Sequence, residues 1–446
     1  MGVEMNERHD FKLILAYNIG VAKFLIQGDR FLSGEIAVSG AKNSALKIFA
    51  ASFLFNTPVH VKNVPLIEDI LRLKELLSAV GVRISNTGSK EFALEAPENA
   101  NTDLDKIITK SLRASVVLLG PVLARYGKVS MQHPGGCVIG KRPINFFVDG
   151  LKAMGAKARE ENGCYFFEAK KLRSADFTFL APSVTATETL MMASVLADGK
   201  VILRNCACEP EIVALAEFLN DSGAKIKGAG THTIIIEGLG TKARLTARAP
   251  FEVIPDRIEA GSLLILGALL GNPRGGGLKI KNCRPLHFSS LTAHLEAAGV
   301  KITRGPDWIS VSRPKKLSAV DVKTGEYPGF ATDLQAPFVV FLTQTDGKSQ
   351  IFETIFDGRF EYINELVRMG ANITQCDPHR VIIFGPSPLS GREVKSPDLR
   401  AGLAFVIAGL IAKGTSVVHN VYNIDRGYES LDQKLAAVGA DIKRVS

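Results

Sequence analysis

The sequence predicts an α/β protein made of repeated strand–helix units, and two recurring patterns lead to this prediction. One is a glycine that follows an amphipathic helical stretch and precedes a short strand, a place where glycine can end a helix in the left-handed conformation. The other is a turn followed by an alternating strand, upstream of each of these glycines. Because strand and helix periods alternate within each unit, the fold class is α/β.

The glycine pattern occurs six times, at intervals of about 70 residues. The glycines are Gly81, Gly155, Gly223, Gly299, Gly370 and Gly439. The upstream strands, in the same order, are expected at residues 58–64, 127–131, 199–205, 277–282, 347–352 and 414–420. Each unit therefore runs strand, loop, helix, glycine, strand. Units of this length exceed ordinary solenoid repeats, so we expect them to group three and three into two globular domains.

Two further segments are nearly all apolar, at residues 187–197 and 399–412. Apolar character on every face predicts helices buried inside the two domains. No Pro- or Ser-rich linker separates the units, so we expect the connections between domains to be short.

Composition narrows the class of protein. Of 446 residues, 46% are hydrophobic and 22% charged, which excludes disorder as the main state because the chain can bury a large core. The net charge of +9 favours anionic partners. Aromatic residues make up only 7%, so binding of nucleic acid through base stacking has little support.

The cysteines and the N-terminus bear on location. The six cysteines are scattered and form no CxxC pair, which favours a reducing compartment and no metal site. No apolar run reaches membrane-spanning length. The apolar stretch at residues 13–22 follows acidic residues rather than the basic ones of an export signal. We therefore expect a cytoplasmic protein, in which residues 1–22 are either a dispensable extension or the result of a start codon assigned too early.

Two segments combine small residues with cations. Residues 39–44 read Ser-Gly-Ala-Lys-Asn-Ser, where the backbone can approach a ligand and Lys42 can meet a phosphate. An exposed loop that caps a helix is an equal alternative. Residues 134–143 hold glycines, Cys137, Lys141 and Arg142. The two cations favour the thiolate of Cys137, so a reactive thiol is favoured over an inert one.

The remaining clusters hold carboxylates and arginines. Asp256 and Asp333 each precede an apolar helix, and N-capping is the better interpretation of either in isolation. Surface ion pairs would explain several arginines, yet Arg400 borders a long apolar helix, where an unpaired charge is costly. Converging arginines suit a doubly anionic small substrate, because each guanidinium can bind a carboxylate or phosphate through two hydrogen bonds. The set is Arg113, Arg142, Arg359, Arg400 and Arg426.

Together these segments resemble the enolpyruvyl transferase family, in the branch that acts on UDP-N-acetylglucosamine at the start of peptidoglycan precursor synthesis. The resemblance runs from about Phe24 to the C-terminus, with the motifs in the same order. The matching segments are residues 39–43, 112–115, 134–140, 182–187, 209–213, 255–259, 332–336, 398–401 and 424–429. The resemblance implies two inside-out α/β-barrel-like domains of three units each. One would comprise residues 23–41 and 252–446 and the other residues 42–251, with the active site in the cleft between them.

The resemblance further implies an enzyme that transfers the enolpyruvyl group of phosphoenolpyruvate to the 3-hydroxyl of UDP-N-acetylglucosamine and releases phosphate, without a metal or organic cofactor. Cys137 matches the family's general acid, which fosfomycin alkylates, and Asp333 matches the carboxylate that takes the hydroxyl proton. Lys42 and Arg426 match further catalytic cations. The phosphoenolpyruvate set is Lys42, Asn43, Arg142, Arg359, Arg400 and Arg426. The UDP-sugar set is Asn43, Arg113, Arg142, Pro143, Ile144, Asn145, Phe146, Ser183, Val184, Asp333, Ile355 and Phe356.

The sequence departs from the family pattern beside the expected nucleotide site. Asn145 stands where the family usually has Asp, Phe147 where it has His, and Thr185 where glycine is usual. These departures leave a paralogue with another nucleotide or sugar acceptor as the main alternative. Shikimate-phosphate chemistry is less favoured, because that sister family usually lacks the Pro-Gly-Gly-Cys loop. A nucleotide-sugar or nucleic-acid binding protein without turnover is the alternative from another class, and the oligomeric state stays open.

Overall fold

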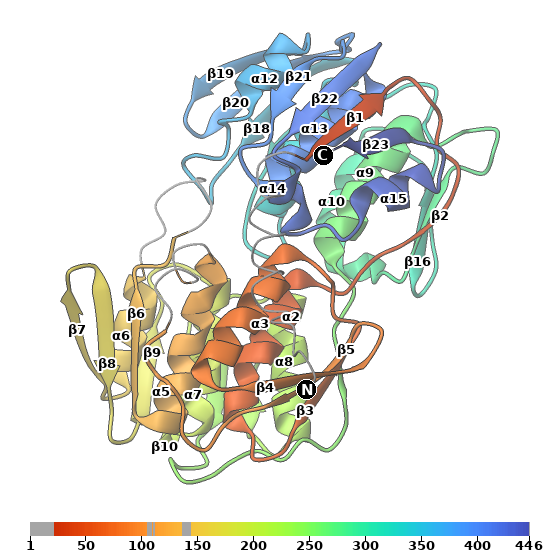
Figure 1. The fold of residues 1–446 in the computed structure, drawn as a ribbon. Coiled ribbons are helices and arrows are strands. Elements are labelled where there is room, and N and C mark those ends of the chain that lie inside the picture. The colour runs from red at the N-terminus through yellow and green to blue at the C-terminus, as the bar shows by residue number, and fades with distance from the viewer. Residues whose placement is uncertain (1–21, 105–108, 110–111, 136–143, 446) are drawn as a thin grey trace.

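The computed structural model describes residues 22–104, 109, 112–135 and 144–445. These residues form two lobes, each around its own hydrophobic core (Figure 1). Buried apolar side chains between Ala41 and Ile254 form the core of the first lobe. Those at residues 24–38 and 258–442 form the core of the second lobe. The domain boundaries expected from the sequence stay predictions.

The first lobe contains eleven described strands. They are β3 (Val59–Lys62), β4 (Arg83–Gly88), β5 (Glu91–Glu95), β6 (Lys128–Gln132), β7 (Lys157–Glu161), β8 (Cys164–Glu168), β9 (Arg173–Thr178), β10 (Asp198–Arg204), β11 (Ile226–Lys227), β12 (Thr233–Glu237) and β13 (Phe251–Glu252). Its described helices are α2 (Lys42–Ala51), η1 (Ser52–Leu54), α3 (Glu68–Val80), η2 (Arg113–Leu118), α5 (Leu119–Tyr126), α6 (Asn145–Ala153), α7 (Val184–Val195) and α8 (Pro210–Asp221).

The second lobe begins with two N-terminal strands and continues after residue 256. Its strands are β1 (Lys23–Gln27), β2 (Gly34–Ala37), β14 (Leu278–Lys281), β15 (Ile302–Arg304), β16 (Trp308–Val311), β17 (Val322–Lys323), β18 (Gly347–Phe352), β19 (Asn372–Asp377), β20 (Arg380–Gly385), β21 (Glu393–Lys395), β22 (Thr415–His419) and β23 (Asp441–Val445). Its described helices are α9 (Arg257–Leu270), η3 (Pro285–Phe288), α10 (Ser289–Ala297), η4 (Thr332–Leu334), α11 (Gln335–Leu342), α12 (Ile363–Arg368), α13 (Leu399–Ile411), α14 (Val421–Asp425) and α15 (Leu431–Ala436).

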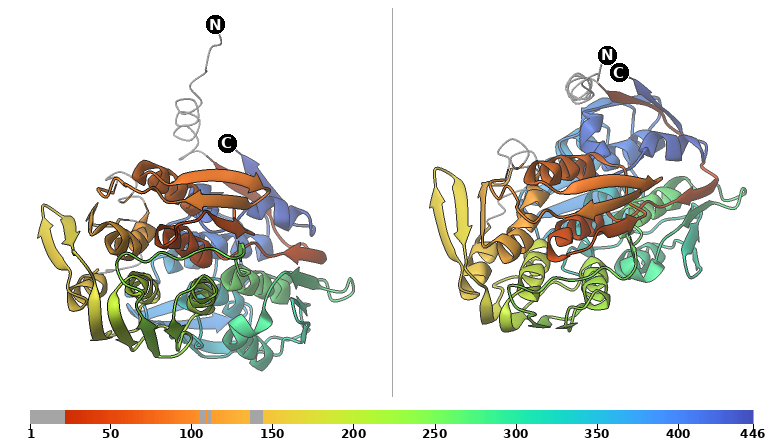
Figure 2. Two further views of the ribbon diagram at one scale, coloured as in Figure 1. Left: turned by 90° about the horizontal axis from the view of Figure 1, so that it is seen from below. Right: turned by 60° about the horizontal axis from the view of Figure 1, so that its bottom comes forward.

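The sixfold repeat predicted from the sequence is confirmed. The described strands form six sheets, one for each unit. All six repeat glycines adopt positive φ, from 91° at Gly155 to 111° at Gly223. In the first five units the strand before the helix pairs antiparallel with the second strand after the glycine, as β3 pairs with β5. In the sixth, β1 takes that place between β22 and β23 (Figure 2).

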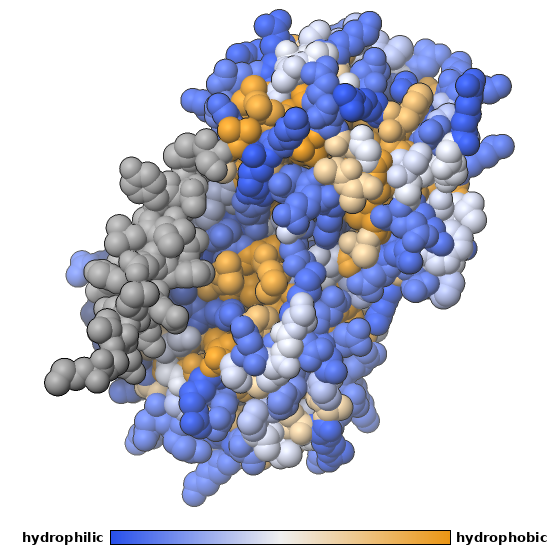
Figure 3. All heavy atoms as spheres, turned by 45° about the vertical axis from the view of Figure 1, so that its right-hand side comes forward, coloured by the Kyte–Doolittle hydropathy of each residue, from blue (hydrophilic) through white to orange (hydrophobic). Residues whose placement is uncertain are grey.

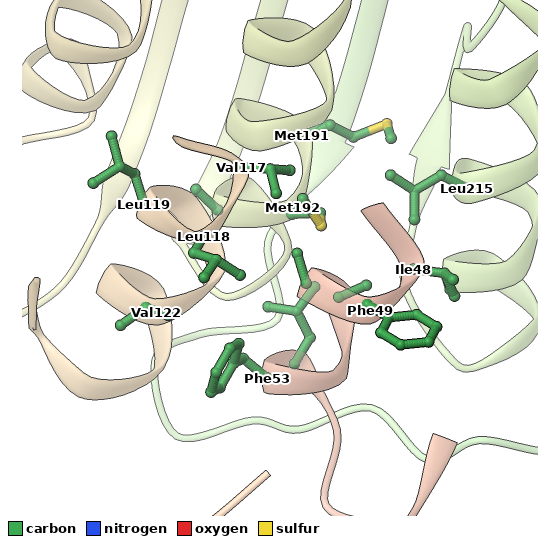
Figure 4. Packing of buried hydrophobic residues seen from close by; sticks show 14 of the residues in the cluster. Ile48, Phe49, Phe53, Val117, Leu118, Leu119, Val122, Met191, Met192 and Leu215 are labelled. Carbon is green, nitrogen blue, oxygen red and sulfur yellow. The ribbon is translucent and has the colours of Figure 1, made fainter. Parts of the chain in front are cut away.

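Apolar helices lie inside the lobes, and the sheets cover them. The two helices predicted to be buried are confirmed as α7 and α13, whose residues are almost all inaccessible to solvent. In the second lobe α9, α11 and α13 pack against one another. In the first, buried side chains of α2, α5, α7 and α8 belong to one hydrophobic core, in which Met191 of α7 and Leu215 of α8 point toward one another (Figure 4). This interdigitation fixes the helix ends that face the other lobe.

Two short chain segments cross between the lobes side by side. Ala41 N donates to Ile254 O at 2.7 Å, and Asp256 N donates to Ser39 O at 2.9 Å. A Cβ atom on Gly40 would lie 1.9 Å from Asn63 O, so only glycine fits there. Gly40 is therefore explained by the close packing of two chain segments, whereas the sequence suggested approach to a ligand.

Candidate active site

A cavity of about 550 Å³ lies where the lobes meet, and both lobes line it. On the face shown in Figure 3, hydrophobic side chains gather in the hollow between the two lobes. Of the residues that the sequence singled out, the cavity brings together Lys42, Asn43, Arg113, Phe146, Ser183, Val184, Asp333, Ile355, Phe356, Arg359, Arg400 and Arg426. These residues come from segments far apart in the chain.

Asp69 joins two cations of the cavity across the lobes. It stands in the first turn of α3 and is 4% exposed. Lys42 Nζ donates to Asp69 Oδ2 at 2.8 Å, and Arg426 Nε, from the second lobe, donates to Oδ1 at 2.9 Å. Burial raises the pKa of Asp69, but the charges of Lys42 and Arg426 outweigh it and hold that pKa below its usual value.

Asp333 joins two further cations of the cavity, both from its own lobe. Arg400 Nη2 donates to Asp333 Oδ2 at 3.0 Å, and Arg359 Nη2 donates to Oδ1. Both arginines are 4% exposed. Burial raises the pKa of Asp333, but the guanidinium groups of Arg400 and Arg359 hold it far below its usual value. Arg400 Nη1 also donates to the buried hydroxyl of Tyr428 at 2.8 Å.

The structure confirms one interpretation made from the sequence and corrects three. N-capping is confirmed for Asp256, which accepts from the backbone of Ile258 and Glu259 at the start of α9. It is wrong for Asp333, because the following helix α11 has no side-chain cap and the carboxylate faces arginines instead. Surface ion pairing is wrong for Arg359 and Arg400, which are buried. The exposed loop at residues 39–44 is also wrong, because Lys42, Asn43 and Ser44 already belong to α2 and residues 39–41 are buried.

A second ionic group lies deeper in the cavity wall. Lys47 Nζ is 3.0 Å from Glu188 Oε2, and the two side chains are 5% and 0% exposed. Burial raises the pKa of Glu188 to about 7, although Lys47 counteracts it. Beside it, Arg257 Nε donates to Glu211 Oε1 at 3.1 Å, from the second lobe to the first. Lys47, Glu211 and Arg257 line the cavity, so its polar wall continues beyond the four cations.

The end of the cavity expected to hold the nucleotide is more apolar. Ser183 is the N-cap of α7, and its hydroxyl accepts from Ala186 N at 3.4 Å. Phe146 packs edge-on against Phe179, with ring centroids 6.1 Å apart. Phe147 is 5% exposed, belongs to the core of the first lobe and touches the cavity. Thr185 also lines this end.

Some predicted residues lie elsewhere. Ile144 is buried and Asn145 is exposed at the start of α6, and neither lines the cavity. Cys137, Arg142 and Pro143 lie outside the described residues. Arg113 donates to Pro134 O at 3.1 Å.

Sequence reasoning missed Asp69, Lys47, Glu188 and Glu211. Asp69 and Glu211 stand in the first turns of helices, where acids are common for helix stability alone. Lys47 and Glu188 sit on apolar helices, and a charge in such a helix is the one signal that could have identified them.

The part of the chain that the structure describes lacks two classes of feature. No cluster of three or more His, Cys, Asp or Glu side chains there could hold a metal ion. Likewise, none of the helices in that part is both long and apolar enough to cross a membrane.

Known proteins are similar to this chain over nearly its whole length. A family model described as EPSP synthase (3-phosphoshikimate 1-carboxyvinyltransferase) matches residues 26–435. A relative from Koribacter versatilis (strain Ellin345), called UDP-N-acetylglucosamine 1-carboxyvinyltransferase, is 42% identical over 430 residues, covering 95% of this chain and 96% of that protein. A relative of the same name from Desulfatibacillum aliphaticivorans is 43% identical over 423 residues, covering 95% and 99%.

Solved structures share the fold. The enolpyruvyl transferase NikO from Streptomyces tendae superposes with a TM-score of 0.85 at 24% identity, covering 96% of this chain and 99% of that one. EPSP synthase from Acinetobacter baumannii superposes with a TM-score of 0.72 at 17% identity, covering 96% and 100%. The two-lobed arrangement of six units is therefore common to these proteins.

Proposed function

The chain belongs to the enolpyruvyl transferase family, and from that premise we propose that it transfers the enolpyruvyl group of phosphoenolpyruvate to the 3-hydroxyl of UDP-N-acetylglucosamine, releasing phosphate. This reaction would start peptidoglycan precursor synthesis. The observation that carries the proposal is the group of four cations, Lys42, Arg359, Arg400 and Arg426, in one cavity between the lobes. Such a group suits a small ligand with both a phosphate and a carboxylate. The acceptor follows from the relatives' names.

The chemistry needs an acid and a base. A proton added to the methylene carbon of phosphoenolpyruvate leaves a cationic centre at C2, and the acceptor hydroxyl oxygen attacks that carbon. The tetrahedral intermediate then loses a methyl proton and its phosphate, which restores the double bond. We assign the first proton to Cys137 and acceptance of the hydroxyl proton to Asp333. The reaction needs no metal or organic cofactor, because phosphoenolpyruvate is a co-substrate.

Binding is shared by the lobes. Lys42, Asn43, Arg142, Arg359, Arg400 and Arg426 are proposed to hold phosphoenolpyruvate. The UDP-sugar is proposed to contact Asn43, Arg113, Arg142, Pro143, Phe146, Ser183, Val184, Asp333, Ile355 and Phe356, but not Ile144 or Asn145, which do not line the cavity. A cavity lined by both lobes lets lobe closure exclude water from the reacting atoms. We also propose a cytoplasmic location, which the free thiols of the five described cysteines support.

The test is phosphate release from phosphoenolpyruvate in the presence of UDP-N-acetylglucosamine. Wild type and Cys376→Ala, an exposed cysteine on β19, should release phosphate, and Cys137→Ala should not. Release only with another uridine nucleotide would identify a paralogue with a different acceptor. No release with any acceptor would contradict the proposal and favour a binding protein.

A further inference from the structure

The four cations of the cavity are already shared by two carboxylates of the protein. Each oxygen of Asp69 accepts from one cation, Lys42 or Arg426, and each oxygen of Asp333 accepts from one arginine, Arg359 or Arg400. These are four of the five cations that the proposed function assigns to phosphoenolpyruvate, and the fifth is Arg142. Protein carboxylates therefore hold the donors that an anionic ligand would need.

Burial explains why the cations need such partners. Their side chains are only 3–14% exposed, and a buried cation without a counter-anion is strongly destabilising. The two carboxylates nevertheless do not accept from every hydrogen-bond donor of these cations. Arg359 Nε and Arg400 Nε are buried donors without an acceptor among the described residues. Two cavity-lining guanidinium groups with unused donors are what an additional anion would satisfy.

We propose that Asp69 and Asp333 are internal counter-anions, which hold the four cations in place until the substrate's anionic groups compete for them. The inference rests on the proposed function, because phosphoenolpyruvate supplies those groups. On binding, the cations exchange carboxylate oxygens for phosphate and carboxylate oxygens of the ligand. Asp69 is thus a positioning residue for Lys42 and Arg426.

The exchange has a consequence for Asp333. Arg400 and Arg359 suppress its proton affinity, with Lys42 and Arg257 acting in the same direction. A ligand that draws these cations away and adds its own negative charge makes Asp333 a better proton acceptor. The base proposed for the acceptor hydroxyl is therefore activated only when the co-substrate is in the cavity.

A purely structural role for Asp69 predicts the opposite effect on ligand affinity. If Asp69 only orients Lys42 and Arg426, removing its charge leaves them misplaced and weakens anion binding. If Asp69 competes with the ligand, removing its charge strengthens anion binding. Asp69→Asn keeps the size of the side chain, so the sign of the change separates the two roles.

The experiment measures binding of inorganic phosphate to the full chain by equilibrium dialysis with labelled phosphate. We expect Asp69→Asn and Asp333→Asn each to bind phosphate on the order of tenfold more tightly than wild type, because each removes a carboxylate that competes with phosphate for two cations. Asp176→Asn is the matched control. It removes one carboxylate charge from an exposed pair with Arg204 on the sheet of the first lobe and should leave phosphate affinity unchanged.

Unchanged or weaker phosphate binding in both cavity variants overturns the proposal. Circular dichroism identifies a variant that fails to fold, and the other variant, on the opposite lobe, then decides the question. Failure of the proposed function is distinguishable. Tighter phosphate binding without turnover on UDP-N-acetylglucosamine would support the counter-anion role and contradict the function. Turnover by wild type together with weaker phosphate binding by the cavity variants would support the proposed function and contradict the counter-anion role.

Discussion

At the scale of single residues, the Lys47–Glu188 pair is the most deeply buried charge pair in the cavity wall. Glu188 is fully inaccessible, and neither of its oxygens makes a hydrogen bond to a described residue, although Lys47 Nζ is 3.0 Å away. Burial and the ammonium group act in opposite directions on its pKa, which ends at about 7. The charge state of this pair therefore changes near neutral pH.

Lys47→Met should destabilise the protein more at pH 8.5 than at pH 6. Without the ammonium group the pKa of Glu188 rises above 7, so at pH 8.5 the variant must either bury an unpaired carboxylate or hold a proton against the solvent. At pH 6 Glu188 is mostly protonated in both proteins. The loss of unfolding free energy at pH 8.5 should exceed that at pH 6 by about 2 kcal/mol, measured by urea unfolding.

Lys47→Met/Glu188→Leu is the control for this pH dependence. Removing both charges leaves neither one unpaired, so the variant should lose less stability than the single change. Its own unfolding free energy should also lack the fall that titration of Glu188 causes between pH 6 and 8.5. An equal loss in Lys47→Met at pH 6 and 8.5 would mean that Glu188 does not titrate in this range.

Tyr428 is a buried residue of the second lobe that holds Arg400 in place. Its hydroxyl is buried and accepts from Arg400 Nη1, so Tyr428→Phe leaves that donor unpaired at a cost of about 1–3 kcal/mol. We expect kcat/KM for phosphate release to fall by about tenfold because Arg400 loses its fixed orientation. Tyr126→Phe, which removes a hydroxyl bonded to Pro97 O outside the cavity, should leave kcat/KM unchanged. Equal kcat/KM in the two variants would show that Tyr428 does not orient Arg400.

At the scale of elements, Asp256 serves two helices at once. One oxygen accepts from Ile258 N and Glu259 N at the start of α9, and the other accepts from Lys42 N at 3.2 Å, at the start of α2. The two helices belong to different lobes. The same carboxylate therefore binds the N-termini of both helices where the chain crosses between the lobes. It thereby fixes the position at which Lys42 enters the cavity.

Asp256→Ala should cost more than the loss of an ordinary cap. We expect unfolding free energy to fall by about 2–4 kcal/mol, because an N-cap contributes about 0.5–2 kcal/mol and the backbone amide of Lys42 also loses its acceptor. Asp398→Ala, which removes the cap of α13 alone, is the comparison and should cost no more than about 2 kcal/mol. Urea unfolding measures both, and equal costs would show that the bond to Lys42 contributes nothing.

The elements differ in how far sequence alone could predict them. The helix-ending glycines and the cap at Asp256 were predictable because each depends on a residue's own backbone or on amides two and three residues away. The pairing of Asp69 with Arg426 was not, because the two are 357 residues apart and no local pattern joins them. The convergence of Arg359, Arg400 and Arg426 followed from family resemblance and not from spacing. Asp333 shows the limit of prediction from local sequence. A carboxylate before an apolar helix has the pattern of an N-cap, and only the structure shows that its partners are Arg359 and Arg400.

At the scale of the whole molecule, the lobes are joined by two chain crossings and by ion pairs. The pairs are Asp69–Arg426 in the cavity, Glu211–Arg257 beside the crossing and Lys90–Glu429, with Nζ and Oε2 2.8 Å apart. The hydrophobic cores of the lobes are separate clusters. The described contacts that join the lobes therefore include these ion pairs but no shared hydrophobic core.

Asp69→Asn/Glu429→Gln should consequently open the molecule. Two of the three pairs are lost, while the crossings and both cores are untouched, so we expect small-angle X-ray scattering to give a radius of gyration about 1 Å larger than that of wild type. Inorganic phosphate should reverse the increase, because it can bridge Lys42 and Arg426 from opposite lobes in place of Asp69. Asp176→Asn should scatter like wild type with and without phosphate. A double variant as compact as wild type would show that the two chain crossings and the Glu211–Arg257 pair are enough to hold the lobes together.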